Sequence, residues 1–217
     1  MKFGKKIHNE SIKFPPIFQR HFINYKKWKK TIKEYKKNME TKSLEMQIYR
    51  TSTIIRLLIK DIEIIDNVFK SAVRLEYSCF TKLFSIFKND YLINEKYAYE
   101  FALLNAEAIR KICKRIDKAI NKHTFTPWLI KCRENHRYSF LGGRDLTYLS
   151  MKYNEKEKEC PICMEETNNL IILNCGHYLC YNCTTKINTS KTLNIKNTCP
   201  FCKCNNAFIN LVNLNNV

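Results

Sequence analysis

The sequence has few of the residues that interrupt helices, and it has no long apolar run. It contains only 4 Gly and 5 Pro among 217 residues, and neither type occurs from Glu40 to Asn89. Because Gly and Pro are the strongest breakers of helices, this gap favours one long helix or two nearly continuous ones. No apolar stretch approaches the roughly 20 residues needed to cross a bilayer, so we expect no transmembrane segment.

The first residues also lack the pattern of a secretory leader. Residues 1–6 contain three lysines and lead into no apolar run, which excludes a signal peptide there. We therefore expect an intracellular protein, in the cytoplasm or nucleus, with reduced thiols. It would reach membranes only through a substrate.

Acidic residues are scarce. Lys and Arg number 38 against 20 Asp and Glu, which gives a formal net charge of +18. Such an excess predicts an anionic partner. Nucleic acid, an acidic membrane surface and a small polyphosphate satisfy net charge equally, so the placement of the charges must decide. Nucleic-acid binding has only the charge in its favour, and we rank it last.

Apolar residues recur at steps of three and four through most of the chain. This spacing predicts helices over 17–39, across 40–89 and over 95–121, and Pro15 and Pro16 mark the start of the first. Long helices with short connections form an antiparallel bundle. The predicted fold is mostly α, with a helical domain over residues 1–140.

A charged linker over residues 141–158 is expected to lead into a small zinc-stabilised module over residues 159–204. The tail over residues 205–217 is rich in Asn but has several apolar residues. It either packs back on the zinc module or frays.

Cysteine is concentrated near the C-terminus. Of the 11 Cys, 7 lie within the 43 residues from Cys160 to Cys202 with one His among them. In a reducing compartment such crowding indicates metal binding. The candidate ligands are Cys160, Cys163, Cys175, His177, Cys180, Cys183, Cys199 and Cys202.

Two Cys separated by two residues can both reach one tetrahedral zinc ion. Eight ligands fill two such sites and leave no open position, so two structural Zn²⁺ are expected. A unit of about 45 residues is too small for an apolar core to stabilise alone, so the metal should supply its folding energy.

The order of the ligands, three Cys, one His and four Cys, resembles that of the RING family. The resemblance implies that the first zinc is held by Cys160, Cys163, Cys180 and Cys183, and the second by Cys175, His177, Cys199 and Cys202. A zinc ribbon or another set of zinc knuckles is the alternative. Cys204, two residues beyond Cys202, is an alternative last ligand.

The RING resemblance implies a ubiquitin ligase. Such a module binds a ubiquitin-conjugating enzyme charged with ubiquitin, so that a lysine of a protein substrate attacks the thioester, and no covalent intermediate forms on the RING. By position, Ile162, Ile187 and Pro200 would contact the conjugating enzyme, although local packing around zinc is their other possible role. Active RINGs commonly have Arg directly after the last ligand, where this sequence has Lys203, which lacks the planar fork of donors.

Three runs near the N-terminus, Met1–Lys5, Phe22–Lys30 and Ala108–Lys118, resemble the SPX family. With the RING behind them, the chain resembles the plant SPX-RING ligases of the nitrogen-limitation-adaptation type. The SPX resemblance implies an inositol polyphosphate ligand and a role in phosphate homeostasis. By position, the polyphosphate site would comprise Lys2, Tyr25, Lys29, Lys111, Lys114 and Lys118, with Arg115 beside them.

Two functions follow. The first is a RING-type ubiquitin ligase that is regulated by inositol polyphosphate. The second is a non-enzymatic polyphosphate sensor or adaptor with a structural RING. The alternative for the lysines is a solvated helix face without a ligand.

Overall fold

The computed structural model of the chain describes residues 2–39, 43–77, 88–153, 159–167, 169–189, 198–204, 207–208 and 211–213. The chain forms two compact units, Met1–Leu141 and Gly142–Val217. Among the helices so described, none combines the length and the apolar composition that crossing a membrane requires.

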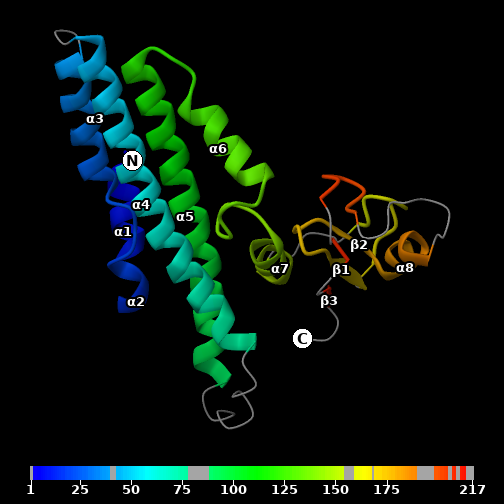
Figure 1. The fold of residues 1–217 in the computed structure, drawn as a ribbon. Helices are drawn as coiled ribbons and strands as arrows, with labels where there is room; N and C mark the ends of the chain where they lie inside the picture. Colours follow the sequence, from blue (N-terminus) through cyan, green and yellow to red (C-terminus); the bar gives the residue numbers. More distant parts are fainter. Residues whose placement is uncertain are drawn as a thin grey trace. The chain divides into compact units, whose positions relative to one another are not determined.

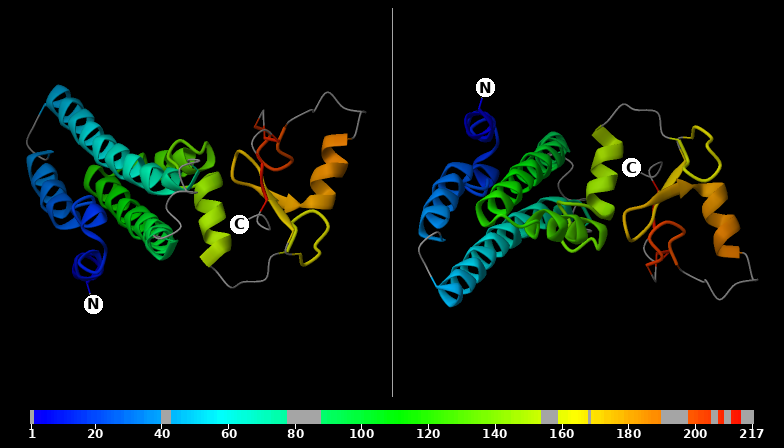
Figure 2. Two further views of the ribbon diagram at one scale, coloured as in Figure 1. Left: turned by 90° about the horizontal axis from the view of Figure 1, so that it is seen from below. Right: turned by 90° about the horizontal axis from the view of Figure 1, so that it is seen from above.

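The first unit consists of helices. In chain order these are α1 (Phe3–Ser11), α2 (Pro16–Gln19), α3 (Tyr25–Met39), α4 (Leu44–Tyr77), α5 (Lys88–Ile120) and α6 (Phe125–Glu134). The three longest, α3, α4 and α5, run in alternating directions (Figures 1 and 2). Helix α5 contacts α3, α4 and α6. The predicted antiparallel helical bundle is confirmed.

The prediction of a single helix over 17–39 is wrong, because the chain leaves the helical conformation between α2 and α3. In that break the backbone N–H of Ile23 donates to Asn105 Oδ1 on α5 at 2.9 Å. The rings of Phe18 and Phe22 both contact Phe101, with centroids 5.2 and 4.9 Å apart. The bend thus packs the rings of Phe18 and Phe22 against α5. The buried side-chain amide of Asn105 accepts the hydrogen bond of the Ile23 N–H, which has no partner within a helix.

The other two predicted helices are found with shifted ends. Helix α4 occupies the middle of the 40–89 stretch, and residues 78–87 lie outside the described part. Helix α5 begins at Lys88, which is earlier than the predicted start at residue 95.

The core of the first unit is aromatic and β-branched. The largest fully buried side chains include Phe69, Phe101, Ile62, Ile65 and Ile109. These residues follow the three-and-four spacing of the sequence. The predicted apolar stripes are therefore the faces on which α4 and α5 pack.

The second unit holds α7 (Arg144–Tyr153), β1 (Leu170–Ile172), β2 (Tyr178–Cys180), α8 (Tyr181–Thr189) and β3 (Val212–Asn213). The strands form one sheet in the order β2-β1-β3, and both pairings are antiparallel. Residues 144–153, which we expected in a linker, form α7, and Met151 of this helix packs against the buried cluster of the unit.

The described part of the tail packs on the zinc module. Val212 pairs with Ile172 in the sheet, and Ala207 is fully buried. The backbone N–H of Asn174 donates to the carbonyl oxygen of Ala207 at 2.9 Å. The tail was predicted either to pack on the zinc module or to fray, and these residues of the tail pack on it.

Candidate functional site

A tight hairpin between β1 and β2 positions two of the predicted ligands. Leu173 N–H donates to the His177 carbonyl oxygen at 2.7 Å, and Gly176 N–H donates to the Leu173 carbonyl oxygen at 2.9 Å. Gly176 has φ of +88°, a conformation that suits Gly because it has no Cβ. The turn thereby presents Cys175 and His177 on either side of this glycine.

The first Cys-x-x-Cys pair lies in a turn with two backbone hydrogen bonds. Met164 N–H donates to the Cys160 carbonyl oxygen at 2.8 Å, and Cys160 N–H donates to the Glu165 carbonyl oxygen at 2.9 Å. Met164 has φ of +58°. The turn brings Cys160 and Cys163 to the same side of the chain.

The last Cys-x-x-Cys pair repeats this turn. Lys203 N–H donates to the Cys199 carbonyl oxygen at 2.9 Å, and Cys199 N–H donates to the Cys204 carbonyl oxygen at 3.0 Å. Lys203 also has φ of +58°. The two turns, far apart in sequence, therefore have equivalent backbones.

The eight predicted ligands form two groups of four. One group is Cys160, Cys163, Cys180 and Cys183, and the other is Cys175, His177, Cys199 and Cys202. Within each group the ligand atoms lie within 4.8 Å of one another. This is the interleaved grouping that the RING resemblance implied.

The distances within the groups suit zinc. Two thiolates at about 2.3 Å from a tetrahedral ion lie about 3.8 Å apart, and a thiolate and an imidazole nitrogen lie about 3.6 Å apart. Cys163 Sγ is 3.8 Å from Cys180 Sγ, and Cys175 Sγ is 3.5 Å from His177 Nδ1. The two clusters are compatible with two zinc ions, and they leave no ligand position for a hydrolytic water.

The surroundings favour the metal-binding form at some ligands and oppose it at others, since burial raises the pKa of Cys175 and of Cys183. Burial acts to raise the pKa of Cys160, but backbone hydrogen bonds from Cys163, Cys180 and Ile162 outweigh it and lower the pKa to about 6. Burial lowers the pKa of His177, which favours the neutral imidazole. Thiolate and neutral imidazole are the forms that bind zinc.

The predicted conjugating-enzyme contacts differ in exposure. Ile162 is 42% exposed and Lys203 is exposed, whereas Pro200 is half-buried. Ile187 on α8 is partly buried and packs against the buried cluster. Ile162 and Lys203 are therefore accessible, and Ile187 has at least a packing role.

The predicted polyphosphate residues lie on α3 and α5 of the first unit, with Lys2 at the N-cap of α1. Tyr25 is buried, and its hydroxyl oxygen accepts a hydrogen bond from Arg115 Nε at 3.1 Å. The Phe3 ring meets the Tyr25 ring edge-on at 5.0 Å, and Lys111 Nζ lies 3.9 Å from the Phe3 ring centroid. These contacts bring Tyr25, Lys111 and Arg115 together, with Lys2 next to Phe3 in the chain.

The remaining lysines of the set face solvent. Lys2, Lys29, Lys114 and Lys118 are exposed, and none has an ion pair with another described residue. Lys29 lies one turn beyond Tyr25, and Lys114 and Lys118 lie one turn apart on α5. We call the seven residues Lys2, Tyr25, Lys29, Lys111, Lys114, Arg115 and Lys118 the basic cluster.

Sequence reasoning missed two residues beside the basic cluster. Phe3 joins α1 to Tyr25 and Lys111, and its only signal was an aromatic residue within a basic run. Glu107 pairs with Lys111 at 3.1 Å and with Arg110 at 2.7 Å. Hydrogen bonds from Arg110, and then from Lys111, overcome partial burial and lower the pKa of Glu107 to about 2.

Most of the excess charge belongs to the first unit. Residues 1–141 contain 30 basic and 14 acidic side chains, whereas residues 142–217 contain 8 and 6. The anionic partner expected from composition therefore concerns the helical unit.

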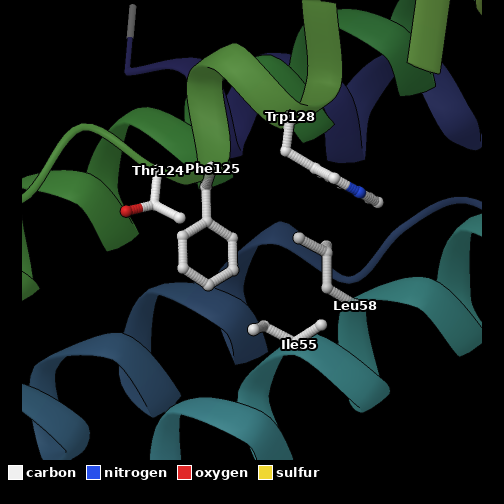
Figure 3. Close-up of a pocket in the computed structure, with 5 residues that line it drawn as sticks. All are labelled: Ile55, Leu58, Thr124, Phe125 and Trp128. Atoms are coloured by element: carbon white, nitrogen blue, oxygen red, sulfur yellow. The ribbon is translucent and has the colours of Figure 1, made fainter. Parts of the chain in front are cut away.

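An apolar pocket of about 100 Å³ lies between α4 and α6 of the same unit. Figure 3 shows Phe125 and Trp128 on α6 facing Ile55 and Leu58 on α4, with Thr124 at the side. The lining has no ionisable side chain. This pocket suits an apolar group and not a polyphosphate.

Comparison with known proteins identifies the class of the zinc module. Residues 156–207 match the family of zinc fingers of the C3HC4 type, the RING fingers. The second unit thus contains a RING finger domain. No solved structure matches the chain.

Two curated proteins are similar to longer stretches of the chain. The "Transcriptional regulator of yeast form adherence 3" of Candida albicans is 32% identical over 124 residues, which is 51% of this chain and 23% of that protein. An "SPX domain-containing membrane protein" of Arabidopsis thaliana is 31% identical over 157 residues, which is 64% of this chain and 22% of that protein. The chain spans less than a quarter of the length of either relative.

Proposed function

We propose that the protein is a RING-type ubiquitin ligase that bridges a ubiquitin-conjugating enzyme and a protein substrate. The observation that supports this most is the pair of complete four-ligand clusters within a RING finger. Ile162 and Lys203 are exposed beside them and available to a partner. The RING finger forms no covalent intermediate in this function, because it only holds the charged conjugating enzyme in a reactive pose.

Autoubiquitination of the zinc-loaded full chain tests the ligase. With a panel of conjugating enzymes we expect ubiquitin transfer, and we expect its loss in Cys175→Ala, which removes one ligand. Lys203→Arg restores the planar fork of donors and should raise the rate severalfold. Lys186 is an exposed lysine on α8. Its substitution Lys186→Ala is the matched control and should leave the rate of ubiquitin transfer unchanged. Failure of transfer with every conjugating enzyme would refute the ligase.

The basic cluster serves, in our proposal, as an inositol polyphosphate site that regulates the ligase in phosphate homeostasis. Support comes from the convergence of α1, α3 and α5 at Tyr25 and from exposed lysines that have no ion pair with another described residue. Several ammonium groups around one compact polyanion form charge-assisted hydrogen bonds. The Arabidopsis relative, whose name includes an SPX domain, supports an SPX-like domain over residues 1–140.

Calorimetry of the full chain with inositol hexakisphosphate tests this site. Lys114→Ala with Lys118→Ala should weaken binding by at least tenfold. Lys60→Ala with Lys131→Ala removes the same charge from exposed positions on α4 and α6 and should change binding much less. If both double variants lost the same amount of affinity, net charge alone would explain the binding, and a defined site would be refuted.

The second candidate function is a non-enzymatic polyphosphate sensor or adaptor in which the RING finger only mediates assembly. Lys203, at the place where active RINGs commonly have Arg, favours it. This function predicts polyphosphate binding without ubiquitin transfer, also in Lys203→Arg. The two assays above therefore separate the candidates.

We also propose the type of ligase, its location in the cell and the bounds of its parts. We place the protein with the nitrogen-limitation-adaptation type of SPX-RING ligases, inside the cell, in the cytoplasm or nucleus. Its RING module covers residues 159–204. We assign residues 205–217 to a tail and the part of 141–158 outside α7 to a linker.

A further inference from the structure

An eighth thiol, in addition to the seven thiols among the predicted ligands, lies beside the second zinc cluster. Cys204 is half-buried and packs against the buried group that includes Cys175 and Cys199. Its thiol interacts with the thiols of Cys175 and Cys202. Cys202, the ligand that the RING order assigns, is itself exposed.

The repeated turn explains why the side chain of residue 204 points to the metal site. Cys204 occupies the position that Glu165 occupies in the first turn, since the carbonyl oxygen of each accepts a hydrogen bond from the backbone N–H of the first Cys of its pair. At that position in the first turn, Glu165 Oε2 lies 3.5 Å from Cys163 Sγ. In both turns, therefore, this residue places its side chain next to the second ligand of the pair. Only the second turn has a thiol there.

The spacing allows Cys204 to bind zinc together with Cys199. Zinc ligands that come in pairs are typically separated by about two to four residues. Four residues separate Cys199 from Cys204, and two separate Cys199 from Cys202. By spacing, either thiol can complete the tetrahedral set with Cys175, His177 and Cys199, and in this structure Cys202 Sγ lies within 4.8 Å of the ligand atoms of all three.

We infer that Cys204 is an alternate fourth ligand of the second zinc site, which can exchange with Cys202. The second site then has five suitable donors for four positions, whereas the first has four thiols. Lys203 lies between the two exchangeable ligands, with φ of +58°. When Cys202 binds zinc, Lys203 lies outside the loop that the metal closes from Cys199. When Cys204 binds, Lys203 lies within this loop.

The exchange has a consequence for activity that depends on the proposed ligase function. Lys203 is the residue expected to contact the conjugating enzyme and ubiquitin, so ligand choice would move this contact. A reagent that modifies the exposed Cys202 would then alter ubiquitin transfer without removing zinc.

Zinc content of the purified full chain tests the ligand exchange without any ubiquitin assay. After passage over a chelating resin, Cys202→Ser and Cys204→Ser should each retain two zinc ions, and the double variant should retain one. Cys163→Ser, the equivalent change in the first turn, is the matched control and should retain one. A failure here would leave the ligase proposal intact, because that proposal needs only the eight predicted ligands.

Three outcomes would overturn the inference. They are one zinc in Cys202→Ser, two zinc ions in the double variant, or two in Cys163→Ser, which would mean that three ligands suffice. Substitution with Co²⁺ gives a second measurement, because thiolate-to-cobalt absorption grows with the number of thiolates. The Co²⁺-loaded Cys202→Ser variant should have the same absorption as the wild type. A lower absorption, as expected for one thiolate ligand fewer, would contradict the exchange.

Discussion

At the scale of single residues, Asp117 shows how one side chain joins two helices. Lying on α5, it accepts hydrogen bonds from the backbone N–H groups of Thr124, Phe125 and Thr126, at 3.0, 2.7 and 2.9 Å. These groups begin α6 and have no partner within it. A carboxylate at this helix end also interacts favourably with the helix dipole.

We predict that Asp117→Ala lowers the free energy of unfolding of the first unit by about 2 kcal/mol, since buried N–H groups lose a charged acceptor. Urea denaturation measures the change. Asp145→Ala in α7 is a control acidic residue outside this unit, and it should not alter the transition of the first unit.

The same residue predicts a pH dependence. Burial acts to raise the pKa of Asp117, but the hydrogen bonds from Thr126, Phe125 and Thr124 outweigh it, so the pKa lies below its ordinary value of 3.8. The stabilisation is therefore complete above that value and is lost as pH falls through the folded-state pKa. Between pH 5 and 3, Asp117→Asn should flatten the fall in stability, and an unchanged slope would contradict this role.

At the scale of elements, the β1–β2 hairpin depends on a close approach. A Cβ on Gly176 would lie 2.5 Å from the backbone carbon of Gly143, which directly precedes α7. Its φ of +88° adds strain for any other residue.

Gly176→Ala should therefore weaken zinc retention at the second site, which uses the ligands on both sides of this glycine. Zinc release to a chelator measures the effect, and we expect at least a tenfold faster release. Asn174→Ala, at an exposed position of the same turn, should release zinc at the wild-type rate. Equal rates in both variants would show that the hairpin tolerates a Cβ.

The sequence predicts those elements whose cause is local. The three-and-four spacing of apolar residues sets the packing faces of α4 and α5, and the spacing of Cys and His limits which ligands can share a metal. The packing faces follow from a few neighbouring residues and were predicted correctly, whereas the interleaved grouping of the ligands came from the RING resemblance.

Other elements depend on distant partners. The break between α2 and α3 requires Asn105, which is 82 residues from Ile23. Helix α7 and strand β3 are stabilised by packing on β1, so their own residues gave no clear signal. The contact of Phe3 with Tyr25 and Lys111 requires three helices to meet, and no spacing predicts it.

At the scale of the whole molecule, the two units owe their stability to different causes. The buried cluster of the second unit consists of Cys160, Leu170, Leu173, Cys175, Leu179, Cys180, Cys183, Cys199 and Ala207. Five of these nine residues are predicted zinc ligands, so without metal this cluster keeps four apolar residues. The first unit has a core of Phe and Ile that needs none.

Removal of zinc should therefore unfold the second unit and spare the first. Structural zinc contributes roughly 10–16 kcal/mol to the folding of small modules. After chelation we expect most of the helical circular dichroism to remain, while proteolysis cleaves the chain after residue 153. Simultaneous loss of both units would contradict this independence.

The uneven charge of the two units has a kinetic consequence. A field of one sign accelerates the encounter with oppositely charged partners, and salt screens it over about 8 Å at physiological ionic strength. Polyanions should thus reach the first unit, with its 30 basic and 14 acidic residues, at a rate that falls steeply with salt. A protein that docks on the nearly neutral second unit should arrive at a rate that salt hardly changes. In one chain, ionic strength would then control the association rate of polyanions but hardly that of a protein partner of the second unit.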